Sequence, residues 1–531
     1  LLLVIVLSFL MLGLGFLFGR QLLQVPLLSK ERIGEVLNLS DEVASNGPLY
    51  SSGYQDKDFF DQAYDQAGAV KSVESRSALV AHHLLVADKI AQVFEMIESK
   101  KVKTVVVLSP NHFSQGVSPA QTTIASWQTP YGVLESDAEA VAELLEAVPV
   151  IKQEDQTFKN EHGIGAITPF IKRSFPNAKI VALALDDSLS VEDANATAFA
   201  IANRFANSIV IASVDMSHYQ PEYVQEFHDE VTLLTLESGG CTDCHLEVDS
   251  NATLEVLTGF NTNLNTLSWQ LTYHGSSLAT GYSDVPEDNT SHIIGYFTEG
   301  EPSVKKFVSL HIVGDIMLDR GVRKQIDKAG DVGYPWQKMD RFLSGTDLVI
   351  GNLEGTVNEQ ASSYTYDPPF RFVFDPSYIK EMAKYVDVVS LANNHASDVG
   401  SAGELESNKW LDEFGVPWFG SYRHPTPRYD TEINGFKLTF IGYHAFQPAE
   451  DELIAEIKTS KSEGRYVIVM PHWGTEYSAT PDSTEKRLAK LMVEAGADLI
   501  VGGHPHVAQG SEIIDGTEVV YSLGNFVFDQ E

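Results

Sequence analysis

Several apolar runs in the second half of the chain end in side chains that bind divalent metals. These side chains are, in order, Asp315, Asn352 with Glu354, Asn394 with His395, His472, and His504 with His506. Carboxylate, amide oxygen and imidazole together suit ions of intermediate hardness such as Mn, Fe or Zn. Each residue alone also has a structural interpretation, as a helix cap or a buried histidine, but such residues have no reason to share one position. The set predicts a common metal site.

A second group of candidate ligands lies in the first half. His82, His112, Asp215 and His218 also follow apolar runs. Three imidazoles and a carboxylate suit a transition metal with open coordination positions. His82 and His83 are adjacent, so only one of them should face a given site. We therefore expect a separate metal centre in this half.

The elements that must position these groups alternate along the chain. Short β-branched runs such as KTVVVLSPNH and VSLHIVGD alternate with amphipathic helical segments. This pattern predicts parallel sheets covered by helices, in which the carboxyl ends of the strands bring ligands together. The polar segment 299–306 is the predicted linker between two α/β domains, 76–298 and 307–531.

The N-terminal run Leu1 to Phe18 contains no charged residue. An apolar helix of this length spans about 27 Å, so residues 1–20 are predicted to be a transmembrane anchor, followed by a juxtamembrane connector over 21–75. A cleaved signal peptide and a buried core helix are the alternatives, and no A-x-A cleavage pattern follows the run. The sequence does not begin with Met, and residues are expected to be missing at both ends.

Composition narrows the function classes. With 73 acidic and 37 basic residues, the net charge of −36 disfavours general nucleic-acid binding and favours cationic partners such as metals. A hydrophobic content of 43% excludes general disorder, and two cysteines exclude a disulfide scaffold. Both cysteines lie in Cys241-Thr242-Asp243-Cys244-His245, a C-x-x-C-H pattern. A local disulfide, c-type haem attachment, and free thiols or metal binding all remain open.

Residues 307–530 resemble the CapA family of capsule and poly-γ-glutamate synthesis proteins. The motifs are VGDIMLDR, GNLEGTV, LANNHASDVG, HWGTEY, GGHPHVAQG and YSLGNFVFDQ. That family is similar to metallophosphoesterases, which implies a sheet sandwich with a two-metal site. The resemblance assigns Asp315 and His506 to one metal, Glu354 to a bridging position, and Asn394, His472 and His504 to the second metal. It makes His395 a general acid or charge stabiliser.

One position departs from the metallophosphoesterase pattern. Those proteins usually carry a histidine two residues after the first aspartate, where this chain has Met317. Unless Asp319 or Asn352 supplies the ligand, one tightly held metal is expected rather than two. Arg371 offers either a fork for a substrate carboxylate or phosphate, or a structural ion pair.

Residues 77–297 resemble the Memo-like family, also called AmmeMemoRadiSam system protein B. PNHFSQG, WQTPYGVLESD, EHGIGAITPFI, SVDMSHY and SHIIGYF carry the resemblance. It implies a fold like that of class III extradiol dioxygenases and makes His82, His112 and His218 ligands of iron or copper, with Asp215 and His162 close by. The family often places a cysteine where this chain has Val248 and Asp249.

These resemblances predict a membrane-anchored protein that synthesises, attaches or releases an anionic surface polymer through a metal-dependent hydrolase or transferase site. The expected partners are the polymer or its precursor, the membrane and polymer-synthesis proteins, with the main body outside the cytoplasm and no nucleic acid bound. Two alternatives remain: a non-catalytic scaffold for polymer assembly, and a non-haem redox enzyme acting through the Memo-like half.

Overall fold

The computed structural model describes residues 2–7, 47–98, 102–282, 285, 289–364, 371–423 and 427–529. The chain separates into two compact units, with the boundary between Lys305 and Lys306. We call the described residues from 47 to 305 the first body. The second body contains the described residues from 306 onward together with strand β1 (Leu2–Leu7).

The first body is built on an eight-stranded sheet with a parallel centre. The central strands are, in spatial order, β3 (Ser77–Val80), β10 (Ser208–Ser213), β4 (Thr104–Pro110) and β9 (Lys179–Leu185). One edge is extended by β12 (Ser291–Thr298) and β11 (Ser268–Ser276), the other by β5 (Ala120–Thr123) and β8 (Ile151–Gln153). Because β12 is antiparallel to β3, the first residues of β12 lie beside the carboxyl end of β3.

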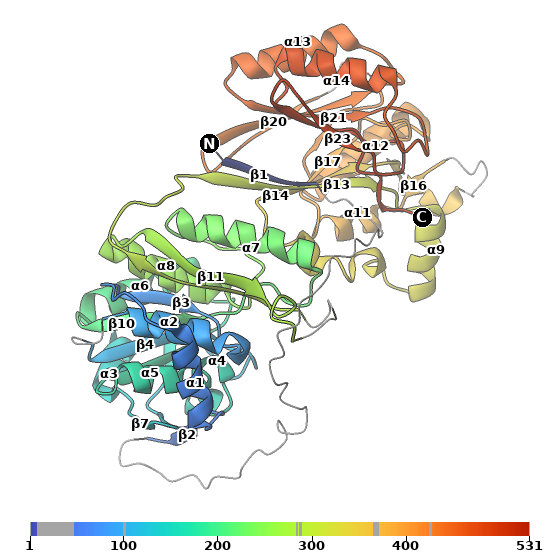
Figure 1. Ribbon diagram of the computed structural model, residues 1–531. Coiled ribbons are helices and arrows are strands. Elements are labelled where there is room, and N and C mark those ends of the chain that lie inside the picture. Colours follow the sequence, from blue (N-terminus) through green and yellow to red (C-terminus); the bar gives the residue numbers. More distant parts are fainter. Residues whose placement is uncertain are drawn as a thin grey trace. The chain divides into compact units, whose positions relative to one another are not determined.

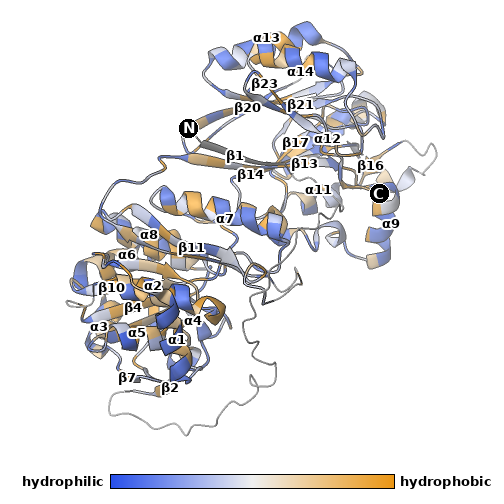
Figure 2. Cartoon of the chain, in the orientation of Figure 1, coloured by the Kyte–Doolittle hydropathy of each residue, from blue (hydrophilic) through white to orange (hydrophobic). Residues whose placement is uncertain are grey.

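Helices cover both faces of this sheet, as the alternating pattern predicts. In β4, Val105 and Val107 pack in one core while Val106 and Leu108 pack in the other, because side chains alternate along a strand. The first core includes α1 (Lys57–Ala67), α2 (Ala87–Met96) and α5 (Thr168–Ser174). The second includes α3 (Ala138–Ala147), α6 (Val191–Arg204) and α8 (Asn251–Leu264). Figure 2 shows β4 and β10 as largely hydrophobic.

Smaller elements complete the first body. They are a sheet of β2 (Leu49–Ser51), β6 (Ser126–Thr129) and β7 (Gly132–Leu134), the helices α4 (His162–Gly165) and α7 (Glu222–Glu237), and the 3-10 helices η2 (Leu84–Val86) and η3 (Asp155–Lys159). A disulfide joins Cys241 to Cys244 ahead of α8. This bridge decides among the alternatives for the C-x-x-C-H pattern, since bridged sulfurs cannot attach haem.

The second body contains two six-stranded sheets. The first comprises β1, β13 (Phe307–Ile316), β14 (Leu348–Leu353), β17 (Val388–Ser390), β18 (Trp418–Phe419) and β25 (Asn525–Val527), all parallel to their neighbours. The second comprises β19 (Tyr429–Ile433), β20 (Phe436–His444), β21 (Tyr466–His472), β22 (Leu499–Val501), β24 (Thr517–Val520) and β23 (Ser511–Ile514).

These sheets pack face to face between two helical layers. Leu310 of β13 shares a core with Leu438 of β20 and Ile468 of β21. On the outer faces lie α9 (Arg320–Ala329), α11 (Pro376–Met382) and α12 (Gly400–Glu413) for the first sheet, and α13 (Glu450–Ser462) and α14 (Ser483–Ala495) for the second (Figure 1). The short pieces are β15 (Thr356–Val357), β16 (Val373–Phe374), α10 (Asp340–Leu343), η5 (Tyr334–Trp336) and η6 (Ala361–Ser363).

The prediction of a transmembrane helix, and with it a single-pass location in the cell membrane, is wrong. Leu2–Leu7 forms strand β1, which pairs in parallel with β13 from Leu2 opposite Phe307 to Leu7 opposite Ile312. Among the described residues, no helix has both the length and the apolar character needed to cross a bilayer. Hydropathy alone misleads here because a buried parallel strand is as apolar as a membrane span. Residues 8–46, which include the rest of the predicted anchor and the first part of the predicted connector, lie outside the described part.

Candidate metal centres

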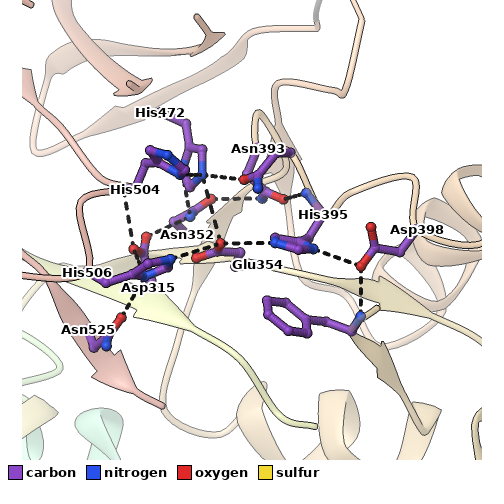
Figure 3. A network of polar contacts seen from close by, with 12 residues as sticks. Asp315, Asn352, Glu354, Asn393, His395, Asp398, His472, His504, His506 and Asn525 are labelled. Atoms are coloured by element: carbon purple, nitrogen blue, oxygen red, sulfur yellow. Dashed lines mark hydrogen bonds and ion pairs between the residues drawn. The ribbon is translucent and has the colours of Figure 1, made fainter. Parts of the chain in front are cut away.

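Strand ends from both sheets of the second body meet at one cluster of polar side chains (Figure 3). Asp315 lies in β13, Asn352 in β14, and His472 at the end of β21. Glu354 follows β14, Asn394 and His395 follow β17, and His504 and His506 follow β22. The geometry thus brings together the residues predicted from their strand-end positions.

Glu354 lies at the centre of this cluster. Its side chain is fully buried, and neither carboxylate oxygen has a hydrogen-bond partner among the described residues. The Oε1 atom lies 3.8 Å from Nε2 of His395, 3.9 Å from Nε2 of His472 and 3.8 Å from Nε2 of His506. Ligands bound to one ion at about 2.1 Å are separated by roughly 3 to 4 Å. The donor set and its orphaned buried carboxylate therefore fit a divalent cation.

The protonation of Glu354 reflects the same surroundings. Burial, followed by the nearby Asp315 carboxylate, raises the pKa of Glu354 well above its usual value. An uncompensated carboxylate at this position is costly, whereas a bound cation would stabilise it in the ionised form.

Asp315 is held by backbone and amide donors. Its Oδ1 accepts a hydrogen bond of 2.8 Å from Asn352 Nδ2, and its Oδ2 accepts one of 3.3 Å from the backbone N–H of His504. His506 Nδ1 lies 3.4 Å from Asp315 Oδ2 and 2.9 Å from Asn525 Oδ1. These contacts orient the carboxylate and a second imidazole before any ion binds.

His472, His504 and Asn394 form the other side of the cluster. His472 Nε2 lies 2.7 Å from Asn394 Oδ1 and 3.2 Å from His504 Nδ1. Burial, followed by the neighbouring His504, lowers the pKa of His472 well below its usual value. Burial also lowers the pKa of His504 to about 4. Both imidazoles are therefore neutral at pH 7, the form that binds metals.

His395 is oriented by two contacts on the side away from Glu354. Its Nδ1 lies 2.8 Å from Asp398 Oδ2, and its ring stacks on Phe372 with centroids 3.9 Å apart. Asp398 also accepts a hydrogen bond of 2.7 Å from the backbone N–H of Phe372. The ring is fixed with Nε2 directed toward the cluster (Figure 3).

The loop that carries His504 and His506 has an unusual backbone. Their φ angles are 94° and 58°, in the left-handed region that non-glycine residues rarely adopt. Hydrogen bonds hold the loop: Gly503 N–H donates to Pro471 O at 3.0 Å, and Tyr477 N–H donates to Pro505 O at 2.7 Å. Such strain persists where the surroundings impose it, typically at functional sites.

Asp319, considered as a substitute metal ligand, and Arg371, considered as a substrate contact, both have other contacts. Asp319 caps α9, pairs with Arg323 at 3.1 Å and accepts a hydrogen bond from the backbone N–H of Val373 at 2.8 Å. The guanidinium carbon of Arg371 lies 5.7 Å from the centre of the Tyr364 ring. Neither residue contacts the cluster through any interaction recorded for the described residues, whereas Asn352 links Asp315 to His472.

The first body has its own cluster at the carboxyl ends of β3, β4 and β10. His82 Nε2 lies 3.3 Å from Asp215 Oδ2 and 3.4 Å from Asp249 Oδ2. His112 Nε2 lies 3.5 Å from the same Asp249 oxygen. Oδ2 of Asp249 thus faces both predicted histidine ligands. The other carboxylate oxygen of Asp249, Oδ1, has no hydrogen-bond partner among the described residues.

The pKa values of the two aspartates in this cluster are shifted in opposite directions. Burial raises the pKa of Asp249 to about 7 against the opposing effect of His112. Burial also acts to raise the pKa of Asp215, but the neighbouring histidines, led by His82, together outweigh it and lower that pKa to about 2. Burial lowers the pKa of His82 to about 3, so this imidazole is neutral.

Glu161 and His162 flank His112. Glu161 Oε1 lies 2.6 Å from His112 Nδ1, and Glu161 Oε2 accepts a hydrogen bond of 3.1 Å from the backbone N–H of His112. The His162 ring centroid lies 3.9 Å from that of His112. His218 is not part of any metal-competent group that the described residues form with His82 and His112.

Comparisons with known proteins agree with this division. Residues 309–530 match the family described as bacterial capsule synthesis protein PGA_cap, and residues 42–262 match the Memo-like protein family. The second body is CapA-like and the first is Memo-like. The resemblances predicted for the two halves are confirmed.

Individual relatives match one body each. The "PGA biosynthesis protein CapA" of Bacillus subtilis is 32% identical over 43% of this chain and 66% of its own length. The "Capsule biosynthesis protein CapA" of Bacillus anthracis is 31% identical over 42% and 60%. A "MEMO1 family protein" of Caldivirga maquilingensis is 33% identical over 23% and 45%. The chain therefore spans less than two thirds of the length of each of these relatives.

Some contributing residues were not predicted. Glu161 directly precedes His162, Asp398 follows His395 by three residues, and Asn525 lies in the YSLGNFVFDQ motif, so nearby signals existed. The sequence marks Asp249 only as one of two residues at the position where the Memo-like family often has a cysteine. His292 lies near the start of β12, which is antiparallel to β3. The pattern of ligands at the carboxyl ends of parallel strands therefore does not predict it.

Proposed function

We propose that the CapA-like body is a metal-dependent hydrolase or transferase acting in the biosynthesis of an anionic capsule polymer such as poly-γ-glutamate. The observation that carries the proposal is the buried Glu354 carboxylate, whose oxygens lack hydrogen-bond partners among the described residues while three imidazoles face one of them. The names of the two CapA relatives support the polymer class.

The chain offers a complete set of ligands for the ion. The residues that would hold it are Asp315, Glu354, Asn394, His472, His504 and His506. A divalent cation held by these residues would polarise an amide or phosphoester oxygen and lower the pKa of a water molecule. Asn352 and Asn525 keep Asp315 and His506 in place through hydrogen bonds of 2.8 and 2.9 Å.

His395 is the group suited to move a proton. With Nδ1 paired to Asp398 at 2.8 Å, the imidazole presents Nε2 toward Glu354. An oriented imidazole of this kind can donate a proton to a leaving oxygen or nitrogen. Asp398 holds the ring in this orientation.

The first test separates metal binding from proton transfer in the full chain. We expect Glu354→Gln to lose bound metal, measured by elemental analysis, because the amide keeps the shape but not the charge. We expect His395→Gln to keep its metal and to lose about 10² to 10⁴-fold in the rate of polymer cleavage. Glu359→Gln is the matched control, since this glutamate is 60% exposed and pairs with Lys409.

A cellular measurement distinguishes the enzyme from a scaffold. A double variant, His472→Ala with His504→Ala, removes one proposed ligand at the end of β21 and another from the loop after β22. The proposal predicts that polymer production falls as it does with Glu354→Gln. Normal polymer production by a stable double variant would overturn the enzymatic role and favour a scaffold.

A further inference from the structure

A second group of metal-competent side chains lies beside the first cluster in the Memo-like body. His83, Asp215 and His292 each offer one ligand atom, and these atoms lie within 4.8 Å of one another. His83 Nδ1 is 3.2 Å from His292 Nε2. The group combines two imidazoles with a carboxylate, the donor set of sites that bind divalent transition metals with open positions.

The arrangement follows from how the strands end. His82 and His83 are consecutive residues after β3, and their rings turn to different neighbours. The His82 ring centroid lies 4.8 Å from that of His112, whereas the His83 centroid lies 5.3 Å from that of His292. Since β12 runs antiparallel to β3, His292 reaches the same sheet edge from the opposite direction. Asp215 belongs both to the group with His83 and His292 and to the group with His82 and Asp249.

His292 is a costly residue to bury without a ligand. It is fully buried, and its Nδ1 atom has no hydrogen-bond partner among the described residues. Its Nε2 faces another imidazole nitrogen, so the two atoms must share one proton or both turn lone pairs toward a cation. A cation satisfies both nitrogens together with the ionised Asp215 carboxylate.

We propose that His83, Asp215 and His292 form a second metal position in the Memo-like body. This position adjoins the one formed by His82, Asp215 and Asp249, beside which His112 lies, and the Asp215 carboxylate is common to both. The ion is a divalent first-row transition metal, and the shared carboxylate makes the centre a two-metal site. This inference concerns a different body from the proposed CapA-like function and does not depend on it.

The stoichiometry of Co²⁺ retained by the full chain tests the second position. We expect His83→Gln and His292→Gln each to retain one equivalent fewer than the unmodified protein, by elemental analysis after removal of free metal. Asp215→Asn should lose two equivalents, because both positions use that carboxylate. His245→Gln is the matched control, since this histidine is 79% exposed and lies in none of the groups.

A spectroscopic readout tests whether the two ions are neighbours. Two Co²⁺ ions that share a carboxylate are exchange-coupled, so their electron paramagnetic resonance signal per ion should rise when His83→Gln leaves one ion alone. His83 is only partly buried, so its variant decides the case if His292→Gln fails to fold. Folded His83→Gln that retains as much Co²⁺ as the unmodified protein, with an unchanged signal, would overturn the proposal.

Discussion

At the scale of single residues, Asp249 shows how one side chain can change the character of a centre. Its Oδ2 lies 3.4 Å from His82 Nε2 and 3.5 Å from His112 Nε2. A carboxylate here is a harder ligand than the thiolate common in the Memo-like family, so it favours Mn, Fe or Zn over copper(I).

Exchange of this side chain should reveal its role. We expect Asp249→Ala to lose the metal held with His82 and His112, because the Asp215 carboxylate that remains is shared with the neighbouring position. Asp249→Cys should retain Co²⁺ and gain a sulfur-to-metal charge-transfer absorption band that the unmodified protein lacks. Asp243→Asn, which alters a 71% exposed acid on the same segment, should change neither property. Full metal retention by Asp249→Ala would remove Asp249 from the ligand set.

Residue types and strand-end positions predicted much of the second site. Asp315, Glu354, His472, His504 and His506 meet because parallel strands release their chains at one edge. The sequence could not show that Asp319 would serve as the cap of α9, because both roles suit an aspartate that precedes a helix. Nor could it place His292, which enters its site from an antiparallel strand.

At the scale of elements, the close approach of β13 and β25 positions two site residues. A Cβ on Gly314 would lie only 2.0 Å from the carbonyl oxygen of Gly524, so no larger residue fits between these segments. Asp315 follows Gly314 directly, and Asn525 follows Gly524. The hydrogen bond of 3.0 Å from Asp315 N–H to Gly524 O ties the two segments together.

Gly314→Ala should therefore disturb the site without touching a ligand. We expect the variant to lower the free energy of unfolding of the CapA-like body by about 1 to 3 kcal/mol, as overpacking does, and to weaken its metal binding. Chemical denaturation and metal titration measure the two effects. Gly510→Ala is the control, since nothing lies within 4 Å of its added Cβ. Equal stability of the two variants would contradict this account.

The elements also show where sequence patterns suffice and where they fail. The nearly complete burial of β4, β13 and β20, whose side chains divide between two cores, follows directly from apolar runs that are covered on both faces. The run at Leu2–Leu7 has the same composition, and its assignment as a membrane helix failed because hydropathy does not report backbone pairing. The distinction requires knowledge of the partner strand.

At the scale of the whole molecule, the net charge of −36 governs encounters with charged partners. An anionic polymer, the substrate class that we propose, would be repelled until it reached the candidate metal site, and salt would screen that repulsion. We expect the rate of reaction with such a polymer to rise between ionic strengths of about 0.01 M and 0.15 M, where the Debye length falls from about 30 to 8 Å. Initial rates at constant free metal provide the measurement. A rate that falls with salt would indicate attraction by a local basic surface instead.

Sulfur chemistry distinguishes this protein from metal centres that depend on cysteine. Both of its cysteines are joined in one disulfide, and the metal-competent groups among the described residues consist of histidines and carboxylates. Peroxide converts a ligand thiolate to sulfenic and then sulfinic acid, which ends metal binding, whereas a carboxylate such as Asp249 does not undergo this reaction. The centre in the Memo-like body is thereby suited to surroundings rich in oxidants, where a cysteine-ligated counterpart would be inactivated.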